Sequence, residues 1–282
     1  MTQMKRRRPV HIPMVPSVHM RRSYAECRFG QLHVLTAYPS GGGFDERTAV
    51  LCLHQAGASG RLFEPLLPEF GRDRSIYAPD LPGHGYSDSA GEKTSVVEHA
   101  SAIGDFIDNL RLRSVDVIGY HVGSLVAAEL AAMRPQQIRR LALIGVPIYN
   151  SQDRLAAGSP RNATTSDDGS QIIEEWQNLL RSRAPGVSIK ALAEAFAERL
   201  RTLESAAAAT VAAYEYPASQ RFPLVKQPVM VLRPKDELWE QTSRARLLLS
   251  RHTAVELPEY GAGLMNAVST KVAVQIREFL DR

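Results

Sequence analysis

Gly-Tyr-His-Val-Gly, at residues 119–123, decides the fold of this chain. The stretch follows a short apolar run at residues 115–118 and opens a segment of mostly small residues at 124–132, a pattern that indicates a strand, a sharp turn and a helix. The two glycines let the backbones approach closely, and the residue between them is held in a strained conformation with its side chain exposed. Since histidine tolerates a positive φ better than most residues, we expect His121 at the apex of the turn.

Strand and helix patterns alternate on both sides of this turn. The strand patterns cover residues 24–29, 31–38, 48–53, 75–78, 115–118, 141–144, 228–232 and 254–257. The helical patterns cover residues 61–70, 96–110, 123–134, 240–250 and 267–280. This alternation predicts an α/β fold with a doubly wound, mostly parallel sheet of about eight strands.

The alternation stops between residues 147 and 222, where loop-like segments separate further helical patterns. We therefore expect three parts in the chain. They are a flexible basic N-terminal arm at residues 1–20, an α/β core at residues 21–147 and 221–282, and a helical cap at residues 148–220. The predicted cap would cover the mouth of a site that contains His121.

The composition fits one domain with an insertion, because a chain of 282 residues with 44% hydrophobic residues can bury a large core. The net charge of +4 equals the Lys-Arg-Arg-Arg run at residues 5–8, so the rest of the chain is electrically balanced. A protein that binds nucleic acid is expected to carry a basic face on the fold itself. We therefore expect no nucleic-acid partner.

The sequence also lacks the signals of a metal, a nucleotide cofactor or a membrane anchor. Cys27 and Cys52 form neither a disulfide framework nor a metal spacing, and the histidines lack the i, i+4 pairs of a zinc motif. No glycine-rich loop has the spacing that cradles a phosphate, and no apolar run has the length of a signal peptide or a transmembrane helix. We expect a cytoplasmic monomer or homodimer without cofactor, whose partner is a small-molecule substrate.

Beyond these patterns, the chain resembles the α/β-hydrolase fold family over residues 24–282, the predicted cap excepted. Residues 119–123 are similar to the family's nucleophile elbow, G-x-S-x-G. Residues 78–88, Ala-Pro-Asp-Leu-Pro-Gly-His-Gly-Tyr-Ser-Asp, are similar to the D-x-P-G-x-G-x-S turn after the fourth strand of cofactor-free members. Residues 53–58, Leu-His-Gln-Ala-Gly-Ala, resemble the His-Gly loop that lends a backbone N–H to an oxyanion hole.

The resemblance implies where the site residues lie. Residues 231–236 look like the segment that ends in the catalytic acid, which would be Asp236. Residues 257–263 resemble the loop that carries the catalytic histidine, and Ala262 occupies the histidine position. The implied oxyanion and binding residues are Ala56, Gln55, Val122 and His54.

Two members of the family's catalytic triad are therefore replaced. His121 stands where the family has the nucleophilic serine, and Ala262 stands where it has the histidine base. In such a triad the base takes the proton of the nucleophile and the acid orients the base, so a serine-esterase mechanism is excluded if Ala262 is native. If Ala262 instead replaces a native histidine, the chain is an inactivated variant.

An imidazole at the apex suits two catalytic roles. His121 would act as a nucleophile that passes through an acyl-imidazole, or as a general base in a dyad with Asp236, since histidine gains and loses protons near neutral pH. The second role is simpler because a base needs no separate partner for the leaving group. We expect a cofactor-free enzyme that hydrolyses or cleaves a small ester, lactone or C–C bond. The alternative is a catalytically inactive ligand receptor in which His121 only contacts the ligand.

Overall fold

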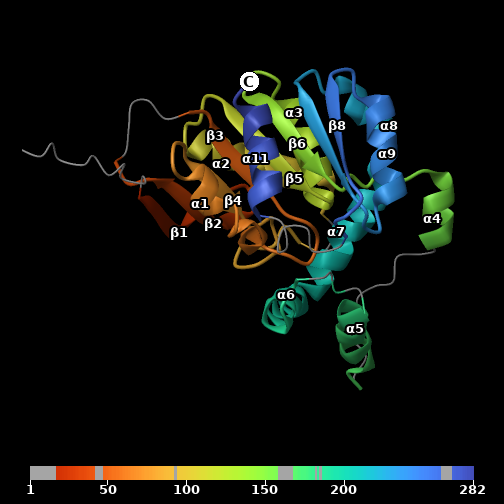
Figure 1. Ribbon diagram of the computed structural model, residues 1–282. Coiled ribbons are helices and arrows are strands. Elements are labelled where there is room, and N and C mark those ends of the chain that lie inside the picture. Colours follow the sequence, from red (N-terminus) through yellow and green to blue (C-terminus); the bar gives the residue numbers. More distant parts are fainter. Residues whose placement is uncertain are drawn as a thin grey trace, which may run out of the picture.

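The computed structural model describes residues 17–41, 47–91, 94–157, 168–181, 183, 186–261 and 269–282. In these residues a single eight-stranded sheet has the order β1-β2-β4-β3-β5-β6-β7-β8 (Figure 1). The strands are β1 (Val18–Cys27), β2 (Gly30–Pro39), β3 (Ala49–Leu53), β4 (Ile76–Pro79), β5 (Val115–Tyr120), β6 (Ile138–Ile144), β7 (Val229–Pro234) and β8 (His252–Leu257). β1 and β2 pair antiparallel, β2 is antiparallel to β4, and the remaining neighbours pair in parallel. The predicted α/β fold is confirmed.

The N-terminal boundary differs from the expected one. β1 begins at Val18 and pairs along its whole length with β2, so residues 18–20 belong to the sheet rather than to a flexible arm. Ala25 of β1 is buried, while most of its other residues face solvent because β1 is an edge strand, so the sequence of its first residues carries no apolar strand pattern. The rest of the expected arm, residues 1–16, lies outside the described residues.

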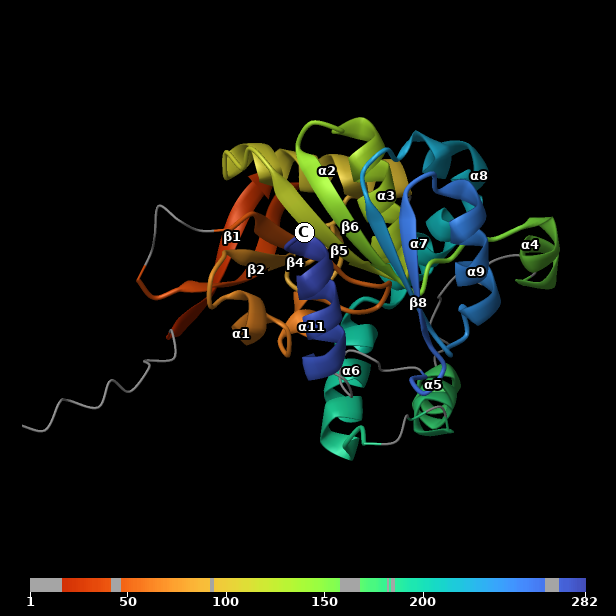
Figure 2. The ribbon, with the colours of Figure 1, turned by 45° about the horizontal axis from the view of Figure 1, so that its top comes forward.

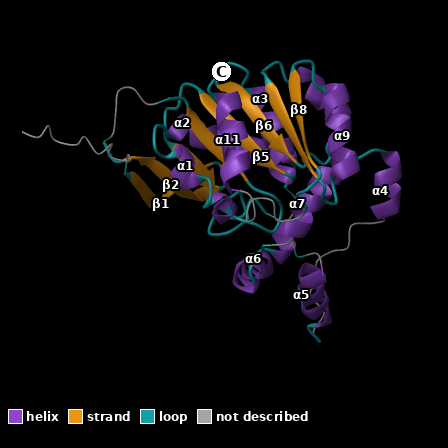
Figure 3. Cartoon of the chain, viewed as in Figure 1, coloured by secondary structure: helices purple, strands orange, loops and turns teal. Residues whose placement is uncertain are grey.

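Helices cover both faces of the sheet (Figure 3). They are η1 (Gly60–Phe63), α1 (Leu67–Phe70), α2 (Val96–Asn109), α3 (Val122–Met133), α4 (Ser151–Ala157), α5 (Ser170–Arg181), α6 (Ile189–Arg201), α7 (Leu203–Glu215), α8 (Ala218–Arg221), η2 (Phe222–Leu224), α9 (Trp239–Leu248) and α11 (Ser269–Leu280). Successive residues of β5 point to opposite faces. Val117 therefore packs in the core that contains α2 and α3, and Ile118 in the core that contains α1 and α11.

The helix expected at residues 61–70 is divided into two short pieces, η1 and α1. Pro65 and Pro68 explain the division, since proline donates no backbone hydrogen bond and its ring obstructs a preceding helical turn. Pro68 is tolerated because it stands in the first turn of α1. The stretch therefore forms two short helices joined by a turn instead of one continuous helix.

Between β6 and β7 the chain forms α4 to α8, in the segment where a cap is expected. α5 and α6 lie beyond the edge of the sheet at which the parallel strands end (Figures 1 and 2). The rings of Trp176 and Phe196 join the two helices, with centroids 5.2 Å apart. The far end of the segment is tied to α3, because the buried carboxylate of Glu129 accepts hydrogen bonds from the Tyr216 hydroxyl and the Arg221 guanidinium.

The buried carboxyl of Asp116 in β5 is expected to make the stability of the fold depend on pH. Its side chain is fully buried, with Oδ2 2.5 Å from Nη2 of Arg139, and burial raises the pKa of its carboxyl to about 6. The folded protein therefore holds a proton that the unfolded chain releases above about pH 4, so ionisation of Asp116 lowers stability as the pH rises from 4 to 6.

We expect the unfolding free energy of Asp116→Asn, relative to wild type, to increase by about 2 kcal/mol between pH 4 and pH 7. The increase arises because asparagine does not lose the proton that the wild type loses in this range. Urea unfolding of both proteins at several pH values measures it. A difference that is constant with pH would contradict the assignment.

Candidate active site

The backbone at residues 119–123 forms a sharp strand–turn–helix. β5 ends at Tyr120, α3 begins at Val122, and His121 between them has φ 51° and ψ −117°. A Cβ added at Gly119 would lie 2.6 Å from the carbonyl oxygen of Gly123, and one added at Gly123 would lie 2.0 Å from that of Leu53. Only glycine fits at either position, and the close approach sets the start of α3 against the loop after β3.

The imidazole of His121 pairs directly with Asp236. Its Nε2 lies 3.0 Å from Oδ2 of Asp236, which follows β7 and has a fully buried side chain. The other carboxylate oxygen, Oδ1, accepts the backbone N–H of Leu238 at 2.9 Å. Because a carboxylate only accepts, we assign a proton to Nε2 and a free lone pair to Nδ1. The apex side chain thus contacts the Asp236 carboxylate without an intervening residue.

Two neighbours hold the ring in this orientation. The ring of Tyr120 stacks on it at 4.4 Å between centroids with an interplanar angle of 6°. Gly145, immediately after β6, leaves the space that the ring occupies, since a Cβ there would lie 2.6 Å from Cδ2 of His121. Sequence reasoning did not select Gly145, although a glycine directly after a central strand signals a close approach.

Glu237 is a further residue that sequence reasoning missed. Its Oε1 lies 3.7 Å from Nδ1 of His121, on the side of the ring opposite the Asp236 contact. Burial raises the pKa of the stacked Tyr120 hydroxyl, and the charges of Asp236 and Glu237 raise it further, so that ring stays neutral. In the sequence Glu237 is only one member of an Asp-Glu pair at residues 236–237, a pattern too common on protein surfaces to indicate this contact.

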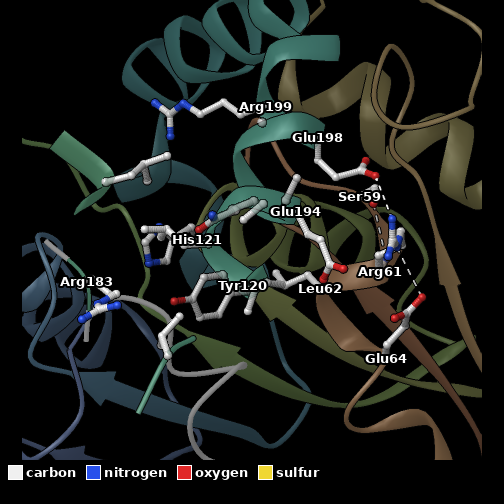
Figure 4. Close-up of a pocket in the computed structure, with 18 of the residues that line it drawn as sticks. Ser59, Arg61, Leu62, Glu64, Tyr120, His121, Arg183, Glu194, Glu198 and Arg199 are labelled. Atoms are coloured by element: carbon white, nitrogen blue, oxygen red, sulfur yellow. Dashed lines mark hydrogen bonds and ion pairs between the residues drawn. The ribbon is translucent and has the colours of Figure 1, made fainter. Parts of the chain in front are cut away.

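A cavity of about 640 Å³ lies beside the His121 ring. Its walls combine the segment around η1 with residues of α5 and α6, and Glu237 borders it next to His121. Figure 4 shows His121 and Tyr120 on one side, with Arg183, Glu194 and Arg199 around them. The segment predicted as a cap therefore contributes side chains to the same cavity as His121.

Ion pairs link the parts of this wall. Nη1 of Arg61, in η1, lies 3.4 Å from Oε1 of Glu198 in α6, and Nε of Arg61 lies 3.4 Å from Oε1 of Glu64 (Figure 4). Nε of Arg199 lies 2.8 Å from Oε1 of Glu175, which joins α6 to α5. Most of these side chains are partly exposed, so each pair contributes little to stability and mainly fixes the shape of the cavity wall.

The predicted oxyanion residues lie around the same cavity. Gln55 borders it, whereas Ala56 and Val122 are each one residue away from a bordering residue, Gln55 and His121 respectively. The backbone N–H groups of Ala56 and Val122 have no acceptor in the part of the chain that the structure describes. Val122 is the first residue of α3, where an N–H normally has no partner within the helix. Both groups are thus available as donors.

His54 has a structural role instead. Its side chain is fully buried, its Nδ1 lies 2.7 Å from the carbonyl oxygen of Gln55, and its Nε2 accepts the N–H of Leu81 at 2.8 Å. Burial lowers the pKa of His54, which keeps the ring neutral as this pattern of bonds requires. Both ring nitrogens are used, which corrects the prediction that His54 is an oxyanion or binding residue.

Ala262 lies outside the described residues. The chain leading to it is close to the dyad, because the N–H of Lys235 donates to the carbonyl oxygen of Tyr260 at 2.7 Å, one residue before Asp236. Within the described ranges, no group of three or more His, Cys, Asp or Glu is arranged to hold a metal ion. Nor does any helix of those ranges combine the length and apolarity needed to cross a bilayer.

Curated relatives match limited segments of the chain. A 116-residue segment is 38% identical to lipase LipV of Mycobacterium tuberculosis (strain ATCC 25618 / H37Rv) and covers 40% of this chain and 41% of that protein. A 118-residue segment is 31% identical to 2-hydroxymuconate semialdehyde hydrolase of Pseudomonas sp. (strain CF600) and covers 38% of each chain. The chain thus spans less than half the length of these relatives.

Similarity of fold and of sequence pattern extends further. The enol-lactonase of Burkholderia xenovorans LB400 superimposes with a TM-score of 0.79 at 17% identity, over 92% of this chain and 100% of that chain. A thermophilic esterase of Thermogutta terrifontis gives a TM-score of 0.74 at 17% identity, over 93% and 98%. The sequence model of the alpha/beta hydrolase fold family matches residues 48–246. The chain belongs to the α/β hydrolase fold family.

Proposed function

We propose that the protein is a hydrolase of small carboxylic esters or lactones in which His121 is a general base on water and Asp236 holds the base. The observation that carries the proposal is the 3.0 Å pairing of the apex imidazole with a buried carboxylate, beside a cavity. A positioned base of this kind contributes about 10² to 10⁴ in rate. No serine and no second histidine are required.

The reaction follows from the orientation of the ring. Asp236 accepts a hydrogen bond from the Nε2–H of His121 and keeps that proton on the ring. Nδ1 of His121 therefore takes a proton from water while the water oxygen attacks the substrate carbonyl. The N–H groups of Val122 and Ala56 stabilise the oxyanion that forms. Collapse of the tetrahedral intermediate breaks the bond to the leaving oxygen, which receives the proton from Nδ1. Ester and water become acid and alcohol, and the dyad returns to its starting state.

The base role is favoured over the nucleophile role for a chemical reason. Attack by Nδ1 of His121 would give an acyl-imidazole, and its hydrolysis would need another base to activate water. Asp236 does not serve, because its Oδ2 pairs with Nε2 and its Oδ1 accepts the N–H of Leu238. The general-base route needs the one imidazole that the geometry provides.

The choice of substrate rests on size and on the relatives. A cavity of about 640 Å³ falls within the usual range for small-molecule sites. Named relatives include a lipase and a pimeloyl-[acyl-carrier protein] methyl ester esterase from Neisseria meningitidis, 34% identical over 94 residues, and a structural neighbour is an enol-lactonase. These three names support ester or lactone hydrolysis, whereas 2-hydroxymuconate semialdehyde contains no ester bond, so the relative named for its hydrolysis keeps C–C cleavage as the alternative. The whole protein's substrate remains part of the proposal.

We expect wild-type protein to hydrolyse members of a panel of short-chain esters and lactones without forming a covalent intermediate, since water is the nucleophile. Product release is followed by chromatography, and the mass of the enzyme during turnover is measured by native mass spectrometry at neutral pH, because acid would hydrolyse an acyl-imidazole. An acyl adduct on His121 would replace the base role by the nucleophile role. Turnover of 1,3-dicarbonyl compounds alone would indicate C–C cleavage, and tight ligand binding without turnover would support a receptor.

A further inference from the structure

The second nitrogen of the apex imidazole faces a carboxylate that the family resemblance does not assign. Oε1 of Glu237 lies 3.7 Å from Nδ1 of His121, and both residues border the cavity. The other ring nitrogen, Nε2, lies closer to its carboxylate, 3.0 Å from Asp236, whose side chain is fully buried. The ring is therefore flanked by two carboxylates, one buried and one in contact with solvent.

The distance to Glu237 is informative. At 3.7 Å the two atoms are too far apart for a direct hydrogen bond, and Nδ1 carries no proton to donate while Asp236 holds the proton on Nε2. The separation allows one water molecule to donate one hydrogen to Nδ1 and the other to Oε1. A water held in this way has its lone pairs directed away from both acceptors.

The backbone at Glu237, and with it the position from which the side chain starts, is fixed by hydrogen bonds of its neighbours. The backbone N–H of Leu238 donates to Oδ1 of Asp236, and that of Trp239 donates to its carbonyl oxygen, which pins the turn on either side of Glu237. Among the described residues, His121 is the one basic group within 4 Å of the Glu237 carboxylate. Its side chain is 66% exposed, so it has no evident packing role.

We infer that Glu237 positions the attacking water, as the second acceptor of a water molecule whose first acceptor is Nδ1 of His121. The inference rests on the proposed function. In the reaction, the hydrogen that points to Nδ1 is transferred to His121, the hydrogen that points to Glu237 stays on the oxygen, and a lone pair of that oxygen forms the bond to the substrate carbonyl. Glu237 gains and loses no proton.

The test separates kcat from KM in variants of Glu237. In Glu237→Ala, kcat is expected to fall about a hundredfold, because misplacing a reacting group by about an ångström has an effect of this size. In Glu237→Gln the amide oxygen still accepts, without charge, so kcat is expected to fall only about tenfold. KM should stay within about threefold in both. Added formate is expected to restore part of the activity of Glu237→Ala. It should leave the activity of the wild type unchanged.

Glu240→Ala is the matched control. Glu240 is also an exposed carboxylate, three residues later, and pairs with Arg233 at 3.8 Å without bordering the cavity. Its kcat should equal that of the wild type. A raised KM with unchanged kcat in Glu237→Ala would mean that Glu237 binds substrate, and would overturn the inference, as would equal activity of Glu237→Ala and Glu240→Ala.

The outcomes also separate this inference from the function on which it rests. Loss of turnover in His121→Ala together with full turnover in Glu237→Ala would overturn the role of Glu237 alone. Turnover that survives in His121→Ala would overturn the general-base function and the water site with it. A wild-type protein that turns over no member of the ester and lactone panel would overturn both.

Discussion

Replacing His121 by alanine is expected to lower kcat/KM about 10²- to 10⁴-fold, because the variant loses the proposed base that takes the proton from water. The Asp236 carboxylate would remain in place with the Leu238 N–H as its partner and without the imidazole. Leaving a buried acceptor with one partner removed costs about 1–3 kcal/mol in stability, so the alanine variant should also unfold at a lower temperature. Steady-state kinetics and thermal unfolding measure the two effects.

His121→Gln separates catalysis from stability in the same position. The side-chain amide of glutamine has an N–H that can donate to Asp236 as Nε2 does, but it has no basic nitrogen. We expect its stability to lie nearer the wild type while its activity is as low as that of His121→Ala. His121→Ser should also be inactive, because Ala262 provides no base for a serine. Activity within tenfold of the wild type in the glutamine variant would exclude the base role.

Much of the fold follows from the sequence because hydrophobic periodicity and turn chemistry act locally. The glycines around His121 require the sharp turn, and the period of two in β5 distributes Val117 and Ile118 to the two cores. The single helix expected at residues 61–70 is wrong, because the apolar spacing fits a helix while Pro65 and Pro68 prevent a continuous one. The apolar spacing favours one helix there, but the two prolines restrict the backbone, and the structure follows the prolines.

Only the site residues that stand in a family motif could be predicted from the sequence. Asp236 is implied by the family resemblance of residues 231–236, and the structure brings it to His121 across 115 positions of sequence. Glu237 gave no signal, since an exposed glutamate beside an aspartate is common on any surface. His54 was misassigned because a histidine in a loop near the site gives no indication of burial, and burial with two backbone partners is what makes it structural.

Replacing Asp236 by asparagine should lower activity almost as much as removing His121, because it changes which nitrogen of the imidazole carries the proton. The turn fixes the orientation of the new amide, because its oxygen must accept the N–H of Leu238, as Oδ1 of Asp236 does at 2.9 Å. The amide NH₂ then faces Nε2 of His121 and donates to it. The imidazole responds by carrying its own proton on Nδ1, which removes the lone pair that faces Glu237 and the cavity.

We therefore expect Asp236→Asn to lower kcat by about 10³- to 10⁴-fold with little change in KM, the size of effect that the same exchange has on a catalytic triad through the wrong tautomer. Nitrogen NMR of His121 should show the protonated ring nitrogen change from Nε2 in the wild type to Nδ1 in the variant. Asp236→Ala is the control, since it leaves the tautomer unconstrained and should retain more activity than the asparagine variant. Full activity of Asp236→Asn, or an unchanged tautomer, would show that the dyad does not set the proton on which the base mechanism depends.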